Sequence, residues 1–219
     1  MTVSFKSTSR SWGLLFLVMV IAVSSVYSDT TATALSPLLS LLRKNYNPET
    51  PLSTKFSLTI YWSVREKEEK KKGMIELAPG DRFRITIGSE TFVSNGETFW
   101  QYSPTTNQVV VKRLADVDRT ALPSRILDRS IAEYPFREVE RKKDLVQLAW
   151  KSDSADAPYS HIVVWVQEEA GTISRCVMTD RNDNTFTYVF SATTIGKNIP
   201  RERFEFEQPK SARIVDMRK

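Results

Sequence analysis

The feature that most constrains this chain is a strict alternation of apolar and polar residues between Lys55 and Trp62. Phe56, Leu58, Ile60 and Trp62 fall on one side of this stretch, and polar residues fall between them. Such a period of two predicts a strand with one face buried. Further segments with strand character follow at 74–77, 82–87, 91–94, 98–102, 108–114, 136–141, 145–150, 162–167, 173–179, 186–191 and 204–206. The sequence therefore predicts some ten antiparallel strands.

Two segments differ from this pattern and predict helical or irregular structure. Ser36-Pro37 is a favourable helix start, and Leu38, Leu42 and Tyr46 then recur at helical spacing. Between 116 and 134, Leu122, Ile126 and Leu127 predict a short helix or an apolar loop. The charged run 65–72 is expected to be a solvated hairpin connection. The result is a mainly β (α+β) fold, with a strongly curved antiparallel sheet wrapped on helices.

The N-terminus has the three parts of an export signal. Lys6 and Arg10 precede an uncharged apolar run from Trp12 to Val23, and small residues follow. The run is too short to favour a spanning helix, which needs ~20 apolar residues. We expect residues 1–28 to be a cleaved signal peptide and 29–219 to form a single domain; a retained membrane anchor is the alternative. A signal peptide predicts an exported protein.

Residues that carry out catalysis or bind metals are scarce. His161 is the only histidine and Cys176 the only cysteine, so a surface role and a packed apolar role are expected for them. The Asp180–Asn184 run lacks the spacing of a calcium loop and predicts a turn. We therefore expect no catalytic residue, metal or cofactor, and no enzyme, although an unidentified pair of carboxylates leaves a hydrolase as an alternative.

The net charge gives no indication of nucleic-acid binding. The chain carries a formal charge of +5, and removal of Lys6 and Arg10 with the signal lowers it to +3. The more prominent feature is a set of large apolar residues on one face of successive strands, which can line a concave interior or form an ordinary packed core; pattern alone favours the core. The set comprises Phe56, Ile60, Trp62, Ile75, Phe83, Ile85 and Ile87.

Two ordered blocks resemble the LolA-like family of periplasmic lipoprotein carriers. The first block is GMIELAPGDRFRITIGSETFVSNGETFWQYSPTTNQVVV, and the second is DRNDNTFTYVFSATTIGKNIPRERFEFEQPKSARIVD. In the first, the matching positions are Gly73, Pro79, Phe83, Arg84, Val93, Ser94, Asn95, Gly96, Trp100, Tyr102, Pro104, Gln108 and Val109. In the second, they are Asp180, Asn184, Thr185, Tyr188, Phe190, Asn198, Ile199, Phe204, Phe206 and Pro209.

The resemblance implies an unclosed antiparallel half-barrel with helices as a lid over a hydrophobic cavity. It also implies a soluble, monomeric carrier that takes acylated lipoproteins from an inner-membrane transporter to an outer-membrane acceptor. A related lipid- or protein-sensing domain is the alternative. The acyl chains would lie on Phe56, Leu58, Ile60, Trp62, Ile75, Leu77, Phe83, Ile85, Ile87 and Trp100. The lid candidates are Leu38, Leu42, Leu122, Ile126 and Leu127.

One position departs from the better-known members of this family. They carry an Arg beside the Pro that precedes the Phe, and this Arg holds the lid. This chain has Ala78-Pro79-Gly80 there, so Arg82 or Arg84 is the candidate substitute.

Overall fold

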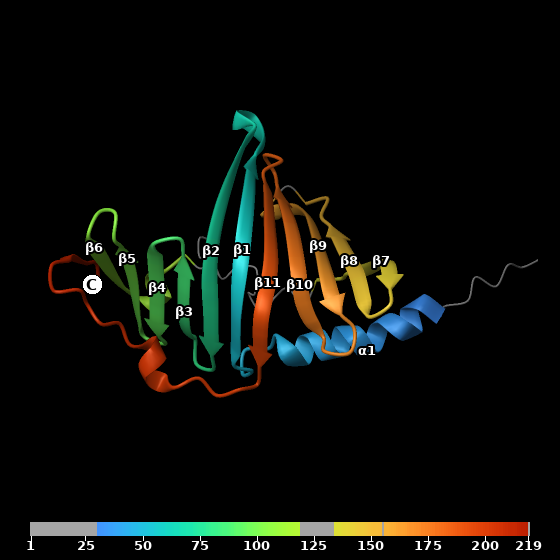
Figure 1. Cartoon of the computed structure of the whole chain (residues 1–219), viewed down its shortest axis with the longest axis horizontal. Coiled ribbons are helices and arrows are strands. Elements are labelled where there is room, and N and C mark those ends of the chain that lie inside the picture. Colours follow the sequence, from blue (N-terminus) through green and yellow to red (C-terminus); the bar gives the residue numbers. More distant parts are fainter. Residues whose placement is uncertain (1–29, 119–133, 155, 219) are drawn as a thin grey trace, which may run out of the picture.

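The fold is one continuous sheet, seen in a computed structural model that describes residues 30–118, 134–154 and 156–218 (Figure 1). Its strands are β1 (Leu52–Trp62), β2 (Lys67–Ala78), β3 (Arg82–Ile87), β4 (Glu90–Asn95), β5 (Thr98–Ser103), β6 (Gln108–Arg113), β7 (Arg137–Lys142), β8 (Leu145–Lys151), β9 (Tyr159–Gln167), β10 (Thr172–Asp180), β11 (Thr185–Ile195) and β12 (Arg213–Asp216). Their spatial order is β12-β6-β5-β4-β3-β2-β1-β11-β10-β9-β8-β7. The sheet is therefore unclosed within the described residues, and β7 and β12 form its two edges.

Strand β1 lies at the centre, and its burial follows the alternation expected from the sequence. Phe56, Leu58 and Ile60 are buried, whereas Ser57 and Tyr61 are exposed. We call the face that carries Phe56, Leu58 and Ile60 the inner face, and the opposite one the outer face. Antiparallel pairing with β2 and β11 continues this division across the sheet, because directly paired residues point to the same side. The predicted antiparallel sheet is confirmed, except that β12 runs parallel to β6.

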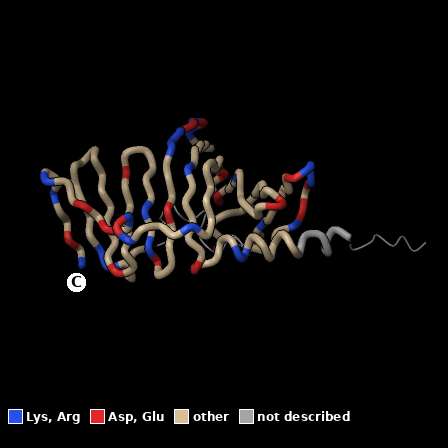
Figure 2. Tube along the Cα trace, turned by 60° about the horizontal axis from the view of Figure 1, so that its bottom comes forward, with Lys and Arg blue, Asp and Glu red and all other residues tan. Residues whose placement is uncertain are grey.

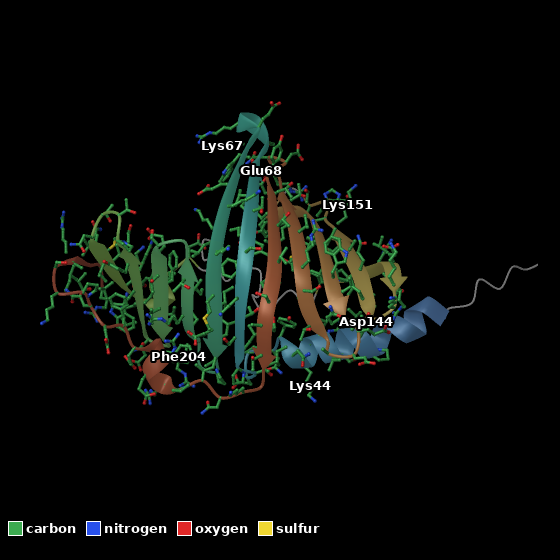
Figure 3. The ribbon with its side chains drawn as sticks, viewed as in Figure 1. Lys44, Lys67, Glu68, Asp144, Lys151 and Phe204 are labelled. Carbon is green, nitrogen blue, oxygen red and sulfur yellow. The ribbon has the colours of Figure 1, made fainter. Side chains whose placement is uncertain are left out.

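The expectation of a solvated connection at 65–72 is wrong for most of that run. Residues 67–72 belong to β2, and the connection is only the short 3-10 helix η1 (Ser63–Arg65) and Glu66. Backbone pairing to β1 does not require apolar side chains, and Lys70 and Lys72 stay exposed while their backbone completes the ladder. The β1–β2 hairpin consequently projects beyond its neighbours, with Lys67 and Glu68 near its end (Figure 3).

Helix α1 (Thr30–Asn45) runs along one end of strands β8–β10 (Figure 1). It begins before the expected start at Ser36, so Pro37 lies inside it rather than in its first turn. The expected docking face is confirmed, because Leu38, Leu42 and Tyr46 are all buried in the main core cluster. The other lid candidates, Leu122, Ile126 and Leu127, and the proposed signal peptide at 1–28 fall outside the described residues.

The chain after β11 crosses the end of the sheet to reach its far edge (Figure 1). The strand expected at 204–206 is wrong: η6 (Arg201–Phe204) is a 3-10 helix that packs against β3 and β4. A strand cannot insert there, because β3 and β4 already have two hydrogen-bonded neighbours each. Phe204, fully buried, anchors the crossing instead, and β12 then pairs with the free edge of β6 (Figure 3).

Candidate ligand-binding face

The structure brings nine of the ten predicted acyl-chain residues together on the inner face. Strand pairing places Leu77 opposite both Leu52 and Phe83, and Ile75 opposite Ile85. These contacts join β1, β2 and β3 into one apolar surface. Its buried members are Phe56, Leu58, Ile60, Ile75, Phe83 and Ile85, and Trp62, Leu77 and Ile87 are partly buried against the same cluster.

Gly73 makes room for the largest side chain at the centre of this surface. It pairs with Phe56 on one side and Ile87 on the other. A Cβ at this position would lie 2.4 Å from the Phe56 ring and 2.1 Å from the Thr86 carbonyl oxygen. The glycine therefore lets the Phe56 ring lie close to the backbone of β2, and this explains why a glycine is needed inside a strand.

The other half of the inner face lies on strands β8–β11 and was not assigned to the site from the sequence. Phe186, Tyr188 and Phe190 follow the same period of two along β11 and are the signal that locates it. The Tyr188 ring lies 5.6 Å from the Phe56 ring and 6.1 Å from the Phe190 ring, centroid to centroid. This aromatic ladder joins the two halves across β1. Its neighbours on the inner face are Val146, Leu148, Ile162, Val164, Val166, Cys176 and Met178.

The polar groups within this apolar surface are held neutral. Cys176 is fully buried beside Tyr188, as expected for a packed thiol, and burial raises its pKa. Burial likewise raises the pKa of Tyr188. A raised pKa keeps both groups uncharged at neutral pH, so the inner face carries no charge at its centre.

Charged side chains border this apolar surface at the projecting hairpin and near β7. On the projecting hairpin, Lys71 pairs with Leu58 and its ammonium lies 2.9 Å from the Glu69 carboxylate. Near β7, Arg141 contacts two carboxylates, with 2.6 Å to Glu138 and a second ion pair to Glu168. The apolar surface is thus bounded by ion pairs at the hairpin and at β7.

Helix α1 covers part of the inner face and is fastened at its C-terminal end. The Tyr46 hydroxyl accepts a hydrogen bond from the Ile173 N–H at 2.8 Å. The Asn45 amide donates to the carbonyl oxygens of Ala170 and Gly171 at 2.9 and 3.0 Å. These polar contacts come from the β9–β10 turn and the start of β10, and no sequence pattern indicated them. Leu38 and Leu42, by contrast, hold the helix through apolar packing alone.

Neither candidate arginine lies on the side of the sheet that helix α1 covers. Arg82 and Arg84 alternate with Phe83 and Ile85 along β3, so both point to the outer face. The Arg82 guanidinium donates to the Pro79 carbonyl at 2.8 Å, and that of Arg84 donates to the Arg203 carbonyl at 3.4 Å. Neither arginine therefore holds helix α1, and the other lid candidates, Leu122, Ile126 and Leu127, fall outside the described residues.

Trp100 is the one predicted acyl-chain residue that lies apart from the others. It pairs with Val93 and Val111, which puts it on the outer face, and its ring stacks on Phe206 at 6.2 Å. Together with Tyr102 it packs on a small second cluster formed by Val109, Val111 and Ala212. Its grouping with the inner-face residues is therefore wrong, because the C-terminal crossing needs an apolar surface on the outer side.

The residues considered for chemistry lie away from the inner face or are inert within it. His161 is exposed on the outer face of β9, and Cys176 is the buried thiol already described. Asp180 forms the expected turn, since its carboxylate accepts hydrogen bonds from the N–H groups of Asn182 and Asn184. Within residues 30–118, 134–154 and 156–218, no group of three or more His, Cys, Asp or Glu residues is arranged to hold a metal ion.

The sequence from residue 50 to 207 matches the family described as outer membrane lipoprotein carrier protein LolA. This chain belongs to the LolA family. The match starts just before β1 and ends just after Phe206, so it includes both halves of the inner face and the C-terminal crossing. No curated protein matches the chain by sequence.

A protein of known structure shows the same fold as this LolA-family protein. An uncharacterized conserved protein from Thermus thermophilus is 16% identical, with a TM-score of 0.52, and the match covers 84% of this chain and 99% of that one. A LolA superfamily protein from Nitrosomonas europaea is 12% identical, with a TM-score of 0.44 and coverages of 78% and 97%. LprF from Mycobacterium bovis is also 12% identical, with a TM-score of 0.44 and coverages of 83% and 98%. In the described part of the chain, the helices are too short or too polar to span a bilayer.

Proposed function

We propose that this LolA-family protein carries acylated lipoproteins across the periplasm, from an inner-membrane transporter to an outer-membrane acceptor. Residues 1–28 would direct its export and be removed. The observation that carries the proposal is the uncharged apolar inner face, which is continuous from β3 through β1 to β8. The family match over residues 50–207 supports the same role.

The energetics of an acyl chain explain why a carrier needs such a surface. Each methylene taken from water gains about 0.8 kcal/mol, so a chain of ~15 methylenes gains on the order of 12 kcal/mol when fully buried. A lipoprotein therefore does not leave a membrane unaided. A long apolar face without charge at its centre gives the chain an alternative environment of similar polarity.

We propose that helix α1 acts as the lid and must move for cargo to bind. Phe56 and Leu58 are only 3% exposed, so an acyl chain has to replace whatever covers them. The apolar contacts of Leu38 and Leu42 can be exchanged for contacts with an acyl chain, whereas Asn45 and Tyr46 hold the C-terminal end by hydrogen bonds. Displacing the helix costs part of the binding energy, and the resulting modest affinity allows release.

We propose no chemical step in this cycle. The inner face presents neutral apolar groups, and the one histidine lies on the outer face, away from any bound acyl chain. Binding, shielding and release need only apolar area and a movable cover. This is the work of a chaperone for lipoproteins rather than of an enzyme.

The variant Ile60→Glu tests the proposed binding face. Ile60 is 7% exposed and pairs with Phe186 and Glu69 near the hairpin end of the inner face. A carboxylate there loses hydration and lies beside Glu69, which is already paired with Lys71, so affinity for a fluorescent palmitoylated peptide should fall at least about tenfold. The probe is titrated into the purified protein and followed by fluorescence anisotropy.

The matched control is Ser57→Glu, on the same strand but on the exposed outer face. It should bind the palmitoylated peptide like the wild type. Thermal unfolding is measured on both variants, and if Ile60→Glu fails to fold, Ile87→Ser replaces it, since Ile87 is only partly buried. A folded inner-face variant that binds the probe as tightly as Ser57→Glu contradicts the proposal. Delivery of the bound peptide to acceptor vesicles separates a carrier from a sensing domain.

A further inference from the structure

In the described part of the chain, five strands present a regular patch of unburied residues on the outer face. The patch consists of three rows across β1, β11, β10, β9 and β8, and the register places each residue beside the next. None of its members is buried, although their neighbours along each strand form the core on the other side. The first row is Ser57, Val189, Arg175, Trp165 and Gln147; the second is Thr59, Thr187, Val177, Val163 and Ala149; the third is Tyr61, Thr185, Thr179, His161 and Lys151.

This outer-face patch contrasts with the other half of the same face. Over β3–β6, the C-terminal crossing covers the sheet with Phe204, which is fully buried, and Phe206, which stacks on Trp100. Over β1 and β11, Val189 is 46% exposed and Tyr61 is 40% exposed. The crossing thus protects one apolar area from water and leaves the other open.

The composition of the outer-face patch is that of a protein interface. Its first row holds Trp165 with the Arg175 guanidinium 4.7 Å above the ring, and Tyr61 lies at one corner. Tryptophan, tyrosine and arginine are enriched at interface centres, whereas lysine, glutamate and aspartate are depleted. No carboxylate occurs among the fifteen residues, and Lys151 is the one lysine, at the margin.

The charges of the outer-face patch and its borders indicate the sign of the charge on a partner's surface. Lys72 and Lys70 flank the patch on β2, and Arg137 flanks it on β7. The acidic residues on these borders are Glu68, which lies 3.6 Å from Lys70, and Glu140. The positions of the charged residues along the trace are shown in Figure 2. Within the patch and along these two borders, basic residues outnumber acidic ones, so this surface is mainly basic. It complements an acidic surface and repels a second copy of itself.

We propose that the outer-face patch is a docking site for an acidic surface on a membrane-anchored protein that exchanges cargo with this carrier. The proposal rests on the function proposed above, because a carrier must meet its donor and acceptor while helix α1 moves and the inner face is in use. Docking on the outer face leaves the inner face accessible throughout the exchange.

The size of the outer-face patch suits a transient encounter. Seven strands, with the borders on β2 and β7 included, at ~4.8 Å each and five residues at ~3.3 Å each give about 550 Å² per side. This is less than the ~800 Å² per side of a standard stable interface. A short-lived contact, steered by charge, is what repeated loading and unloading requires.

The variant Val189→Glu tests this docking site, because an exposed position tolerates the change while the new charge opposes an acidic partner. The matched control is Ile214→Glu, a similarly exposed outer-face residue on β12, outside the outer-face patch. The probes are native membrane vesicles from the cells that make the protein, the same vesicles after protease treatment, and liposomes of the extracted lipids. Each variant is labelled with a fluorophore and its binding is measured by flotation.

Wild type and Ile214→Glu should bind the native vesicles alike, Val189→Glu should bind at least about tenfold more weakly, and protease treatment should abolish binding. Equal binding by both variants overturns the proposal. So does equal binding to lipid liposomes, or a dimer in sedimentation equilibrium that only Val189→Glu disrupts. Binding of the palmitoylated peptide, which Val189→Glu should leave unchanged, reports on the proposed function separately.

Discussion

The substitution Asn45→Asp replaces the side-chain amide nitrogen by an oxygen at the C-terminal end of helix α1. The Asn45 side chain is 9% exposed, and its amide nitrogen donates to two carbonyl oxygens at 2.9 and 3.0 Å. In the variant, a carboxylate oxygen faces the same two acceptors with the same shape. The change therefore tests the polar anchor of the lid without altering its packing.

The expected loss is worked from those two contacts. Each buried carbonyl oxygen that is left without its hydrogen bond costs about 1–3 kcal/mol. With two such oxygens, the free energy of unfolding should fall by about 2–6 kcal/mol at pH 7, a large share of the 5–15 kcal/mol or so of a typical domain. Urea unfolding followed by tryptophan fluorescence measures it.

The loss should depend on pH in a defined direction. Burial and two facing carbonyls disfavour the ionised carboxyl, so its pKa in the folded variant is raised above its value in the unfolded chain. A raised folded pKa gives stability that is present at low pH and lost as the pH rises through that pKa. The difference between Asn45→Asp and the wild type should therefore shrink when both are unfolded at pH 4.5.

The control is Asn47→Asp, two residues further along and more exposed. The Asn47 amide donates to the Lys44 carbonyl at 2.9 Å, at a site that water reaches. Its replacement should cost less than about 1 kcal/mol. If Asn45→Asp is no less stable than Asn47→Asp at pH 7, the amide does not fasten helix α1 and the reasoning is refuted.

Three further changes follow from the same contacts. Tyr46→Phe should lower the free energy of unfolding by about 1–3 kcal/mol. Because burial raises the pKa of Tyr46 to about 12, the wild type should also lose stability between pH 10 and 12. Urea unfolding at alkaline pH should show a smaller loss for the variant. Gly73→Ala should cost about 1–3 kcal/mol in urea unfolding, since its Cβ meets the Phe56 ring, and an unchanged midpoint would exclude that clash. Arg203→Gln removes the ion pair at 2.6 Å to the Glu76 carboxylate, which is 8% exposed, so the melting temperature should fall. Adding Glu76→Gln should restore part of the lost melting temperature, because no unpaired carboxylate then remains. No recovery in the double variant would contradict this account.

The strands were predictable because side chains along a strand alternate between the two faces of the sheet, and this alternation is visible in the sequence. Phe56, Leu58 and Ile60 alternate with polar residues, so both the strand and its buried face could be identified. The same rule fails for Trp100, because apolar residues occupy both faces of β5. Which of them faces inward depends on the C-terminal crossing, a contact between residues about a hundred positions apart.

Features that depend on backbone pairing or on tertiary contacts were not predictable. Residues 67–72 extend β2 although they are charged, because β1 offers backbone partners along its whole length. Phe204 and Phe206 have the spacing of a strand, but the strands beside them have no open edge. The anchoring of Asn45 and Tyr46 requires the β9–β10 turn, which lies far along the chain from the helix.

The most direct test of the central claim is to map where an acyl chain lies in the protein. A palmitoylated peptide with a diazirine near the end of its chain is bound, irradiated and located by mass spectrometry of the digested protein. The account predicts adducts on inner-face residues of β1 and β11, such as Leu58 and Tyr188, and a loss of labelling when unlabelled palmitoylated peptide competes. Labelling confined to outer-face residues such as Val189, or labelling that no competitor reduces, would contradict it.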